Sequence, residues 1–221
     1  MLKNNKQKIK ISPSIFAADF AKLGEEARRL EAADAIHVDI MDGHFVPNLS
    51  LSPAALAAIN RSTDKFLDVH IMVYNPFNYI EELVKKGADQ ITFHLEATEE
   101  VEATIEYIRK CNVKVGLAIC PETSDSLIVK YLGKIDTLLL MTVHPGFGGQ
   151  KFIPAILDKV AFAKKLKDDM ELSFDIQVDG GIDDKTAPLC IEAGANHLVS
   201  GTYLFSGKGD ISQKINHLRG S

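Results

Sequence analysis

The segment Ala35-Ile36-His37-Val38-Asp39-Ile40-Met41 predicts a short buried β-strand, and Phe66-Leu67-Asp68-Val69-His70-Ile71-Met72-Val73 predicts a second one after an intervening helix-like stretch at 53–60. Outward from this unit the same alternation continues in both directions. The predicted strands are 10–16, 35–41, 66–73, 90–94, 113–119, 137–143, 173–178 and 196–200. The predicted helices are 19–32, 53–60, 76–86, 99–111, 124–132, 153–168, 185–193 and about 210–218.

Strict alternation of strand and helix favours a parallel sheet. Eight such units in a chain of 221 residues favour closure into a single (β/α)8 TIM barrel, which we place at residues 10–219, after a flexible N-terminal extension at 1–9. The competing layout is a doubly wound open sheet. No G-x-G-x-x-G fingerprint follows the first predicted strand.

The composition excludes some classes of function. A formal net charge of -5 disfavours a nucleic-acid binder, which needs a concentrated basic surface, but main-chain N–H groups can still bind a small anion. The basic opening at 1–8 lacks the apolar run of a signal peptide, and no membrane-spanning segment is predicted. Three scattered cysteines, Cys111, Cys120 and Cys190, favour reduced thiols and a cytoplasmic location, with no cysteine ligand to a metal.

Polar side chains gather at the ends of the predicted strands, where barrels carry their chemistry. Because strand side chains alternate, His37 and Asp39 share one face, as do Asp68 and His70. Asp179 ends the seventh strand. This mixed imidazole and carboxylate set suits zinc, iron, manganese or cobalt. The alternative for each histidine alone is a hydrogen-bonded core residue.

Glycines follow the last three predicted strands. The loop that contains Gly146-Phe147-Gly148-Gly149 lets main-chain N–H groups approach an anion, and Gly180-Gly181 and Gly201-Thr202 lie where barrels commonly build a phosphate site. The alternative is a set of flexible turns. Met41, Met72 and Met141 lie near strand ends, where methionine either fills the core or forms a polarizable cover over a reactive intermediate.

Taken together, these motifs resemble the ribulose-phosphate 3-epimerase family from about residue 10 to 205. The segments that carry the resemblance are Ser12-Pro13-Ser14-Ile15-Phe16-Ala17-Ala18-Asp19-Phe20, His37-Val38-Asp39-Ile40-Met41-Asp42-Gly43-His44-Phe45-Val46-Pro47-Asn48, Asp68-Val69-His70-Ile71-Met72-Val73, Pro145-Gly146-Phe147-Gly148-Gly149-Gln150 and Val178-Asp179-Gly180-Gly181. The resemblance implies epimerisation at C3 of a sugar phosphate, D-ribulose 5-phosphate to D-xylulose 5-phosphate, through a cis-enediolate. It also implies a homo-oligomer, a dimer or a hexamer.

The resemblance further implies one divalent metal ion held by His37, Asp39, His70 and Asp179, with Asp39 and Asp179 also acting as the acid/base pair. The implied substrate contacts are Ser14, His70, Met41, Met72, Met141, Gly146, Phe147, Gly148, Gly149, Gly180, Gly181, Gly201 and Thr202. Inverting a carbon next to a carbonyl requires two acid/base groups, one for each face of the sugar.

Three alternatives stay open. The segments 48–53 and 200–205 look closer to the related D-allulose-6-phosphate 3-epimerases, whereas Gly148-Gly149 and Gly180-Gly181 favour the pentose enzyme. A decarboxylase or hexulose-phosphate synthase barrel would carry an Asp-x-Lys-x-x-Asp motif, but this chain has Asp68-Val69-His70-Ile71 in that place. A phosphosugar sensor without catalysis would not need both Asp39 and Asp179.

Overall fold

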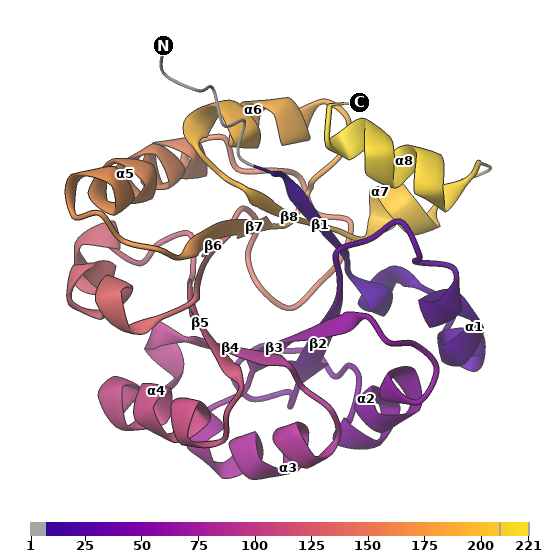
Figure 1. Ribbon diagram of the computed structural model, residues 1–221, viewed down its shortest axis with the longest axis horizontal. Coiled ribbons are helices and arrows are strands. Elements are labelled where there is room, and N and C mark those ends of the chain that lie inside the picture. The colour runs from indigo at the N-terminus through magenta and orange to yellow at the C-terminus, as the bar shows by residue number, and fades with distance from the viewer. Residues whose placement is uncertain (1–7, 208, 221) are drawn as a thin grey trace.

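A computed structural model describes residues 8–207 and 209–220. Its eight strands are all parallel and follow the order β1-β8-β7-β6-β5-β4-β3-β2. A parallel bridge between Ser14 and His37 brings β1 against β2, so the sheet curls into a nearly closed barrel with the helices outside (Figure 1). The predicted (β/α)8 TIM barrel is confirmed. Most of the predicted extension at 1–9 lies outside the described residues.

The strands agree with the predicted ones to within a few residues. They are β1 Lys10–Pro13, β2 Ala35–Met41, β3 Phe66–Met72, β4 Gln90–His94, β5 Lys114–Ile119, β6 Thr137–Met141, β7 Asp175–Asp179 and β8 His197–Ser200. The α-helices are α1 Leu23–Arg28, α2 Pro53–Asn60, α3 Ile80–Lys85, α4 Val101–Lys110, α5 Ile156–Asp169, α6 Thr186–Ala193, α7 Thr202–Phe205 and α8 Ile211–Leu218. Shorter 3₁₀ helices cover Ile15–Ala17, Phe20–Lys22, Pro76–Tyr79 and Leu95–Ala97, and a longer one covers Asp125–Lys134.

Three predicted helices were wrong in kind or length, and of these the segment 76–86 begins with the 3₁₀ helix Pro76–Tyr79 before α3. The segment 19–32 begins as a 3₁₀ turn in which Asp19 accepts the N–H of Ala21, and its α-helix ends at Arg28 because the chain must turn into β2. The segment 124–132 forms a 3₁₀ helix of ten residues, Asp125–Lys134. With about 2 Å of rise per residue, this helix spans the β5–β6 connection with fewer residues than an α-helix would need.

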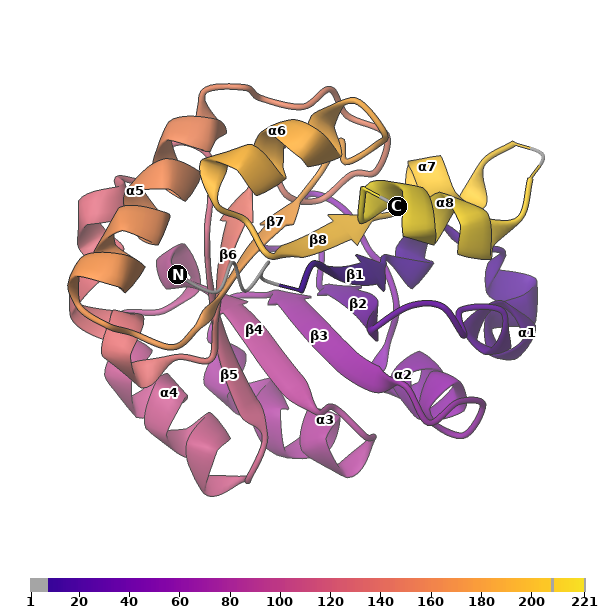
Figure 2. The ribbon, with the colours of Figure 1, turned by 45° about the horizontal axis from the view of Figure 1, so that its top comes forward.

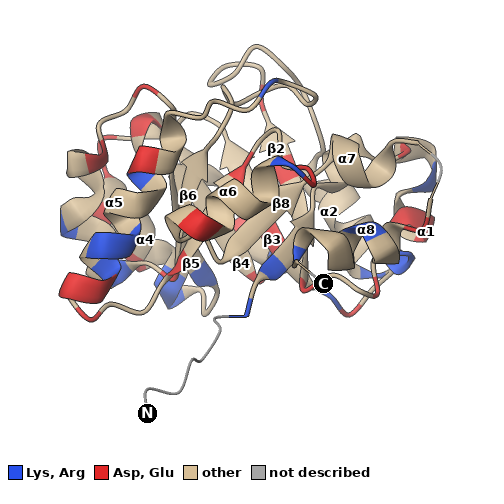
Figure 3. Cartoon of the chain, turned by 90° about the horizontal axis from the view of Figure 1, so that it is seen from above, with Lys and Arg blue, Asp and Glu red and all other residues tan. Residues whose placement is uncertain are grey.

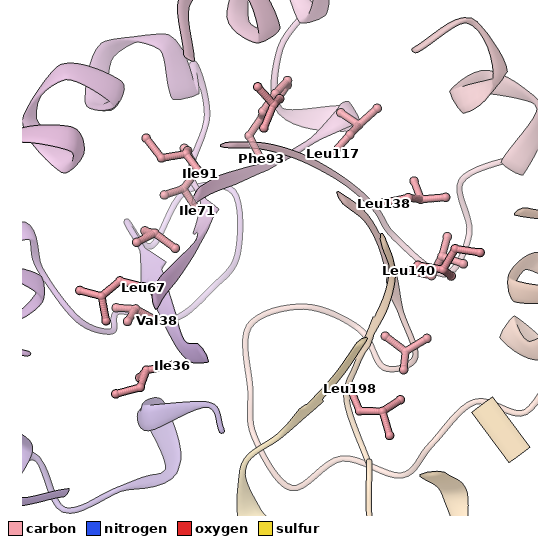
Figure 4. Packing of buried hydrophobic residues seen from close by; sticks show 14 of the residues in the cluster. Ile36, Val38, Leu67, Ile71, Ile91, Phe93, Leu117, Leu138, Leu140 and Leu198 are labelled. Carbon is pink, nitrogen blue, oxygen red and sulfur yellow. The ribbon is translucent and has the colours of Figure 1, made fainter. Parts of the chain in front are cut away.

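The apolar core lies between the strands and the helices. Outward-facing strand residues such as Val38, Leu67 and Phe93 are fully buried there, and Figure 4 shows them on the outer side of the ring. The alternate residues of the same strands point inward. The barrel therefore has an apolar outer layer and an interior that is free to hold polar side chains.

A buried polar layer fills the barrel interior nearer to where the strands begin. Asp68 accepts hydrogen bonds from Gln90 Nε2 (2.8 Å) and Gln177 Nε2 (2.5 Å), and Thr137 Oγ1 donates to Gln90 Oε1 (2.9 Å). These side chains come from four different strands and are less than 4% exposed. Since a buried carboxylate needs partners, this layer holds Asp68 in one place beneath the barrel mouth.

The outer surface carries charges of both signs. Figure 3 shows Lys and Arg interspersed with Asp and Glu over the outer helices. Tilting the barrel shows the slanted strands and the loops beyond their ends (Figure 2). In the part of the chain that the structure describes, no helix combines the length and the apolar character needed to cross a membrane.

Candidate metal and phosphate site

Four side chains from three strands meet at the C-terminal end of the barrel. His37 Nε2 lies 3.4 Å from Asp39 Oδ1 and 3.6 Å from Asp179 Oδ2, while His70 Nδ1 lies 3.2 Å and 3.9 Å from the same two oxygens. The register explains part of the meeting, because Asp39 of β2 pairs with His70 of β3, and Asp179 reaches the cluster from the end of β7. The sequence analysis predicted all four residues, and the structure brings one ligand atom of each within 4.8 Å of the others.

Three carboxylates of the site lack a Lys or Arg partner in the described part of the chain. Asp39 and Asp68 are at most 5% exposed, Asp179 is partly buried beside them, and among the described residues no Lys or Arg side chain pairs with any of the three. Burial and the neighbouring carboxylates of Asp39 and Asp68 raise the pKa of Asp179 to about 7, against the opposing effect of His37. The pKa of Asp39 is lowered: burial raises it, but His37 and His70 lower it more.

A divalent cation fits these residues. Asp68 Oδ2 lies 2.9 Å from His37 Nδ1 and accepts its proton, which leaves His37 Nε2 buried without a hydrogen-bond partner among the described side chains. A metal-binding histidine commonly has a carboxylate behind it in this way. The two imidazoles and two carboxylates are ligands that first-row transition metals accept. The unpartnered nitrogen and the carboxylates without a described Lys or Arg partner both point to a cation at their centre.

The cluster opens into a cavity of about 510 Å³ at the barrel mouth. Its lining includes most of the predicted substrate contacts: Ser14, Met41, Met72, Met141, Gly146, Phe147, Gly148, Gly149, Gly180, Gly181, Gly201 and Thr202. Asp39 and Asp179 also line it. His37 and His70 do not, because both rings are fully buried beneath its floor. Phe147, in the loop between β6 and α5, is half exposed. That loop lies across the barrel opening in Figure 1.

One side of the cavity is formed by glycines and the start of a short helix. Gly149 has φ +73°, and a Cβ added there would lie 3.9 Å from Thr202 Oγ1 at the start of α7. A Cβ at Gly181, with φ +65°, would lie 2.8 Å from the main-chain nitrogen of Phe152. The loops after β6, β7 and β8 therefore converge with bare main chain facing the cavity, an arrangement suited to a phosphate group.

Three methionines give the cavity lining an apolar part. Met41 and Met72 form a buried cluster with Val46, and Met141 packs with Ala118 and Val143. Ser14 Oγ donates a hydrogen bond to Asp39 Oδ2 (2.6 Å), which fixes the orientation of that carboxylate. A ligand in this cavity would contact the carboxylates of Asp39 and Asp179 and the sulfur-containing side chains of Met41, Met72 and Met141.

Sequence analysis missed three residues next to the cluster. His94 Nε2 lies 2.9 Å from His70 Nε2, and its Nδ1 lies 3.3 Å from Glu96 Oε2 and 3.5 Å from Cys120 Sγ. His94, Glu96 and Cys120 are themselves close enough to hold an ion. The spacing His94-Leu95-Glu96 at the end of a predicted strand was the available signal, and it places His94 on the inward face with Thr92.

The fold and the site together define a class, a TIM barrel with a histidine and aspartate cluster and a glycine-lined cavity at its C-terminal face. The sequence model of the ribulose-phosphate 3 epimerase family matches residues 10–205. A ribulose-phosphate 3-epimerase of Chlamydia pneumoniae is 49% identical over 219 residues, which cover 97% of this chain and 96% of that protein. The enzyme of that name from Bacillus subtilis is 45% identical over 96% of this chain and 99% of its own length. This chain belongs to the ribulose-phosphate 3-epimerase family.

Solved structures that resemble this barrel are more distant in sequence. A 3-hexulose-6-phosphate synthase superposes with a TM-score of 0.69 at 17% identity and covers 96% of this chain and 99% of its own. A tryptophan synthase α-subunit from Pyrococcus furiosus gives a TM-score of 0.71 at 17% identity over 97% of this chain and 99% of its own. At such identities these likenesses support the TIM-barrel fold alone.

Proposed function

We propose that this protein inverts C3 of a ketose phosphate and converts D-ribulose 5-phosphate to D-xylulose 5-phosphate. The observation that carries the proposal is the placement of Asp39 and Asp179, two carboxylates from strands on different sides of the mouth, around the same pair of histidines. The names of the curated relatives support the pentose substrate.

Asp39 and Asp179 are the proposed acid/base pair. Between their strands, β2 and β7, lie β1 and β8 (Figure 1), so a sugar across the mouth would present one face of C3 to each carboxylate. One carboxylate removes the C3 proton, which leaves a cis-enediolate, and the other delivers a proton to the opposite face. The hydroxyl of Ser14 holds the Asp39 carboxylate in the orientation that this transfer needs.

His37, Asp39, His70 and Asp179 are the proposed ligands of one divalent ion, with zinc, iron, manganese and cobalt as the candidates. When bound, the ion would act as a Lewis acid that stabilises negative charge on the C2 and C3 oxygens of the sugar. His37 is held for this role by Asp68, which occupies its other nitrogen.

The remaining contacts position the sugar. The main chain of 146–149, with Gly180, Gly181, Gly201 and Thr202, would bind the phosphate at the far end of the cavity. Met41, Met72 and Met141 would cover the enediolate and exclude water from it. His70 would meet the substrate only through the metal site, because its ring lies below the cavity lining.

Two features of the proposal reach beyond the site. The substrate is a small molecule, and we propose that the enzyme works in the cytoplasm as a homodimer or homohexamer, as the family resemblance implies. D-allulose 6-phosphate is the second candidate substrate, since the segments 48–53 and 200–205 resemble those of its epimerases. Comparing turnover of the two sugars side by side distinguishes the candidates.

The decisive experiment follows the C3 proton. In deuterated water, proton NMR should show D-ribulose 5-phosphate losing its C3 proton at the rate at which labelled D-xylulose 5-phosphate forms. Treatment with a chelator should stop both processes, and adding back the metal should restore them. Epimer formation without deuterium at C3 would contradict the enediolate route, and full activity after chelation would contradict the metal site.

A further inference from the structure

A chain of polar contacts runs from His70 to two residues that the proposed reaction does not use. His70 Nε2 lies 2.9 Å from His94 Nε2, and His94 Nδ1 lies 3.3 Å from Glu96 Oε2. Both imidazoles are fully buried, with centroids 5.0 Å apart and planes tilted by 30°. These three residues come from β3, from the end of β4, and from the 3₁₀ helix that follows β4.

Two neutral imidazoles that meet nitrogen to nitrogen have only two arrangements, because one must donate and the other must accept. In the first, His70 Nε2–H donates to His94 Nε2, and the proton on His94 Nδ1 donates to Glu96. In the second, His94 Nε2–H donates to His70, and the lone pair of His94 Nδ1 faces the Glu96 carboxylate. The second arrangement sets the His94 Nδ1 lone pair against the Glu96 carboxylate at 3.3 Å, and the first sets the His70 Nδ1 lone pair against Asp39 Oδ1 at 3.2 Å. A cation held between His70 and Asp39 removes the repulsion at Asp39 and leaves the one at Glu96, so in the cation-bound protein Glu96 selects the first arrangement.

The selected arrangement determines which nitrogen of His70 is free. With its proton on Nε2, the lone pair of His70 lies on Nδ1, the nitrogen that faces Asp39 Oδ1 at 3.2 Å and Asp179 Oδ2 at 3.9 Å. We propose that Glu96 and His94 are positioning residues that hold His70 in this tautomer and so present Nδ1 to a divalent cation. This inference rests on the four-ligand metal site of the proposed function.

The contacts from Glu96 through His94 to His70 form a relay, and the Glu96 carboxylate that ends it is itself fixed in place. Glu96 Oε1 accepts hydrogen bonds from the main-chain N–H of Cys120, at 2.8 Å, and from the hydroxyl of Thr123. Its other oxygen, Oε2, is thereby directed at His94. The loop after β5 thus anchors the relay.

His37, the other histidine of the cluster, is also oriented by a carboxylate, but through direct contact. Asp68 Oδ2 accepts directly from His37 Nδ1 at 2.9 Å, which leaves His37 Nε2 for the cation. A carboxylate therefore stands behind each histidine, in contact with His37 and one imidazole removed from His70. Such outer partners commonly change metal affinity by about 10- to 100-fold when they are lost.

The relay excludes another use of the same residues. His94, Glu96 and Cys120 could hold a second metal ion, since one ligand atom of each lies within 4.8 Å of the others. That use would require the lone pair on His94 Nδ1, which places the proton on Nε2 and reverses the contact with His70. The two readings therefore predict opposite tautomers of His94 and different zinc stoichiometries.

Zinc affinity without sugar tests the relay directly. We expect Glu96→Gln to bind zinc about 10- to 100-fold more weakly than the wild-type protein in competition with a chromophoric chelator, because an amide no longer selects one tautomer. Glu102→Gln, which removes the same charge from the exposed face of α4, should leave the affinity unchanged. His94→Gln, which keeps an acceptor for His70, should lose less affinity than His94→Leu, with folding checked by circular dichroism.

The tautomers are read by ¹⁵N NMR of the zinc-loaded protein, in which we expect the His94 proton on Nδ1. Equal zinc affinity of wild-type protein and Glu96→Gln, or a His94 proton on Nε2, would overturn the relay. Two zinc ions per chain, one of them lost in Cys120→Ser, would overturn it as well. Wild-type protein that bound zinc but did not epimerise the sugar would instead contradict the proposed reaction and leave the relay intact.

Discussion

At the scale of single residues, the two carboxylates of the site have unlike surroundings. Both line the cavity, but Asp39 accepts a hydrogen bond from Ser14, whereas Asp179 makes no hydrogen bond to a side chain of the described residues. We expect Asp39→Asn and Asp179→Asn each to lower turnover by about 100- to 10,000-fold, because one-sided proton transfer cannot invert a carbon. Steady-state kinetics on D-ribulose 5-phosphate measures the loss.

The matched control is Asp158→Asn, which changes an exposed carboxylate on α5 and should keep normal turnover. Near-normal turnover in either site variant would contradict the two-carboxylate assignment. Because both residues are also proposed ligands, zinc affinity is measured in parallel. A variant that binds zinc normally yet fails to turn over has lost the proton transfer itself.

Side-chain alternation was sufficient to predict that these residues share an inward face, but not their surroundings. His37 and Asp39 are two residues apart on one strand, so the sequence alone places them on one face. The contact between His70 and His94 depends on the register of β3 against β4 and on the barrel's curvature, which no local pattern encodes. The role of Asp68 as partner of His37 depends on depth within the barrel in the same way.

At the scale of the elements, buried strands were predicted more accurately than the segments that connect them. The limits of β2, β4 and α2 match the prediction because apolar runs and a proline at the helix start mark them locally. The segments 19–32 and 124–132 deviate because their course is determined by where the next strand must begin. The short helix α7 was not predicted at all, since its four residues are too few for a helical period.

The convergent glycine loops should affect substrate binding more than the chemical step. We expect Gly149→Ala to raise KM for the phosphosugar about 10-fold with little change in kcat, because a Cβ at φ +73° disturbs the main chain that we propose binds the phosphate. Gly207→Ala is the matched control, since it has a similar φ of +75° and no atom within 4 Å of the added Cβ. Equal KM values in the two variants would mean that the loop does not bind phosphate.

At the scale of the whole molecule, one polar contact recurs around the end of the barrel where the strands begin. The residue before each even-numbered strand accepts the main-chain N–H of the preceding odd-numbered strand through its side chain. The four pairs are Asp34 with Ile11, Asp89 with Leu67, Asp136 with Val115, and Asn196 with Ile176. Main-chain bonds from the same four residues back to those partners complete each contact. These contacts thus join four successive pairs of strands at the end of the barrel opposite the candidate site.

Asp34 differs from the other three because it also joins the two ends of the chain. It pairs with Lys8 and with Arg219, which follows α8, in addition to accepting the N–H of Ile11. Burial raises the pKa of Asp34, but Lys8, Arg219 and that N–H together lower it to about 2. A carboxylate with a depressed pKa stabilises the fold above its unfolded-state value of about 3.9 and loses that stabilisation as the pH falls toward 2.

Asp34→Asn separates this charge from the hydrogen bond, because Asn196 shows that an amide oxygen can accept the same main-chain N–H. At pH 7 we expect the free energy of unfolding of the variant to be about 1 kcal/mol lower than that of the wild-type protein. The loss is small because the ion pairs are partly exposed. The difference in the free energy of unfolding should narrow at pH 3. At that pH, Asp34 of the unfolded wild-type chain, with a pKa of about 3.9, binds a proton, and this stabilises the unfolded state. Urea denaturation at the two pH values measures the difference, with Asp158→Asn as the control. A difference that stayed the same at both pH values would show that the charge of Asp34 does not stabilise the closure of the barrel.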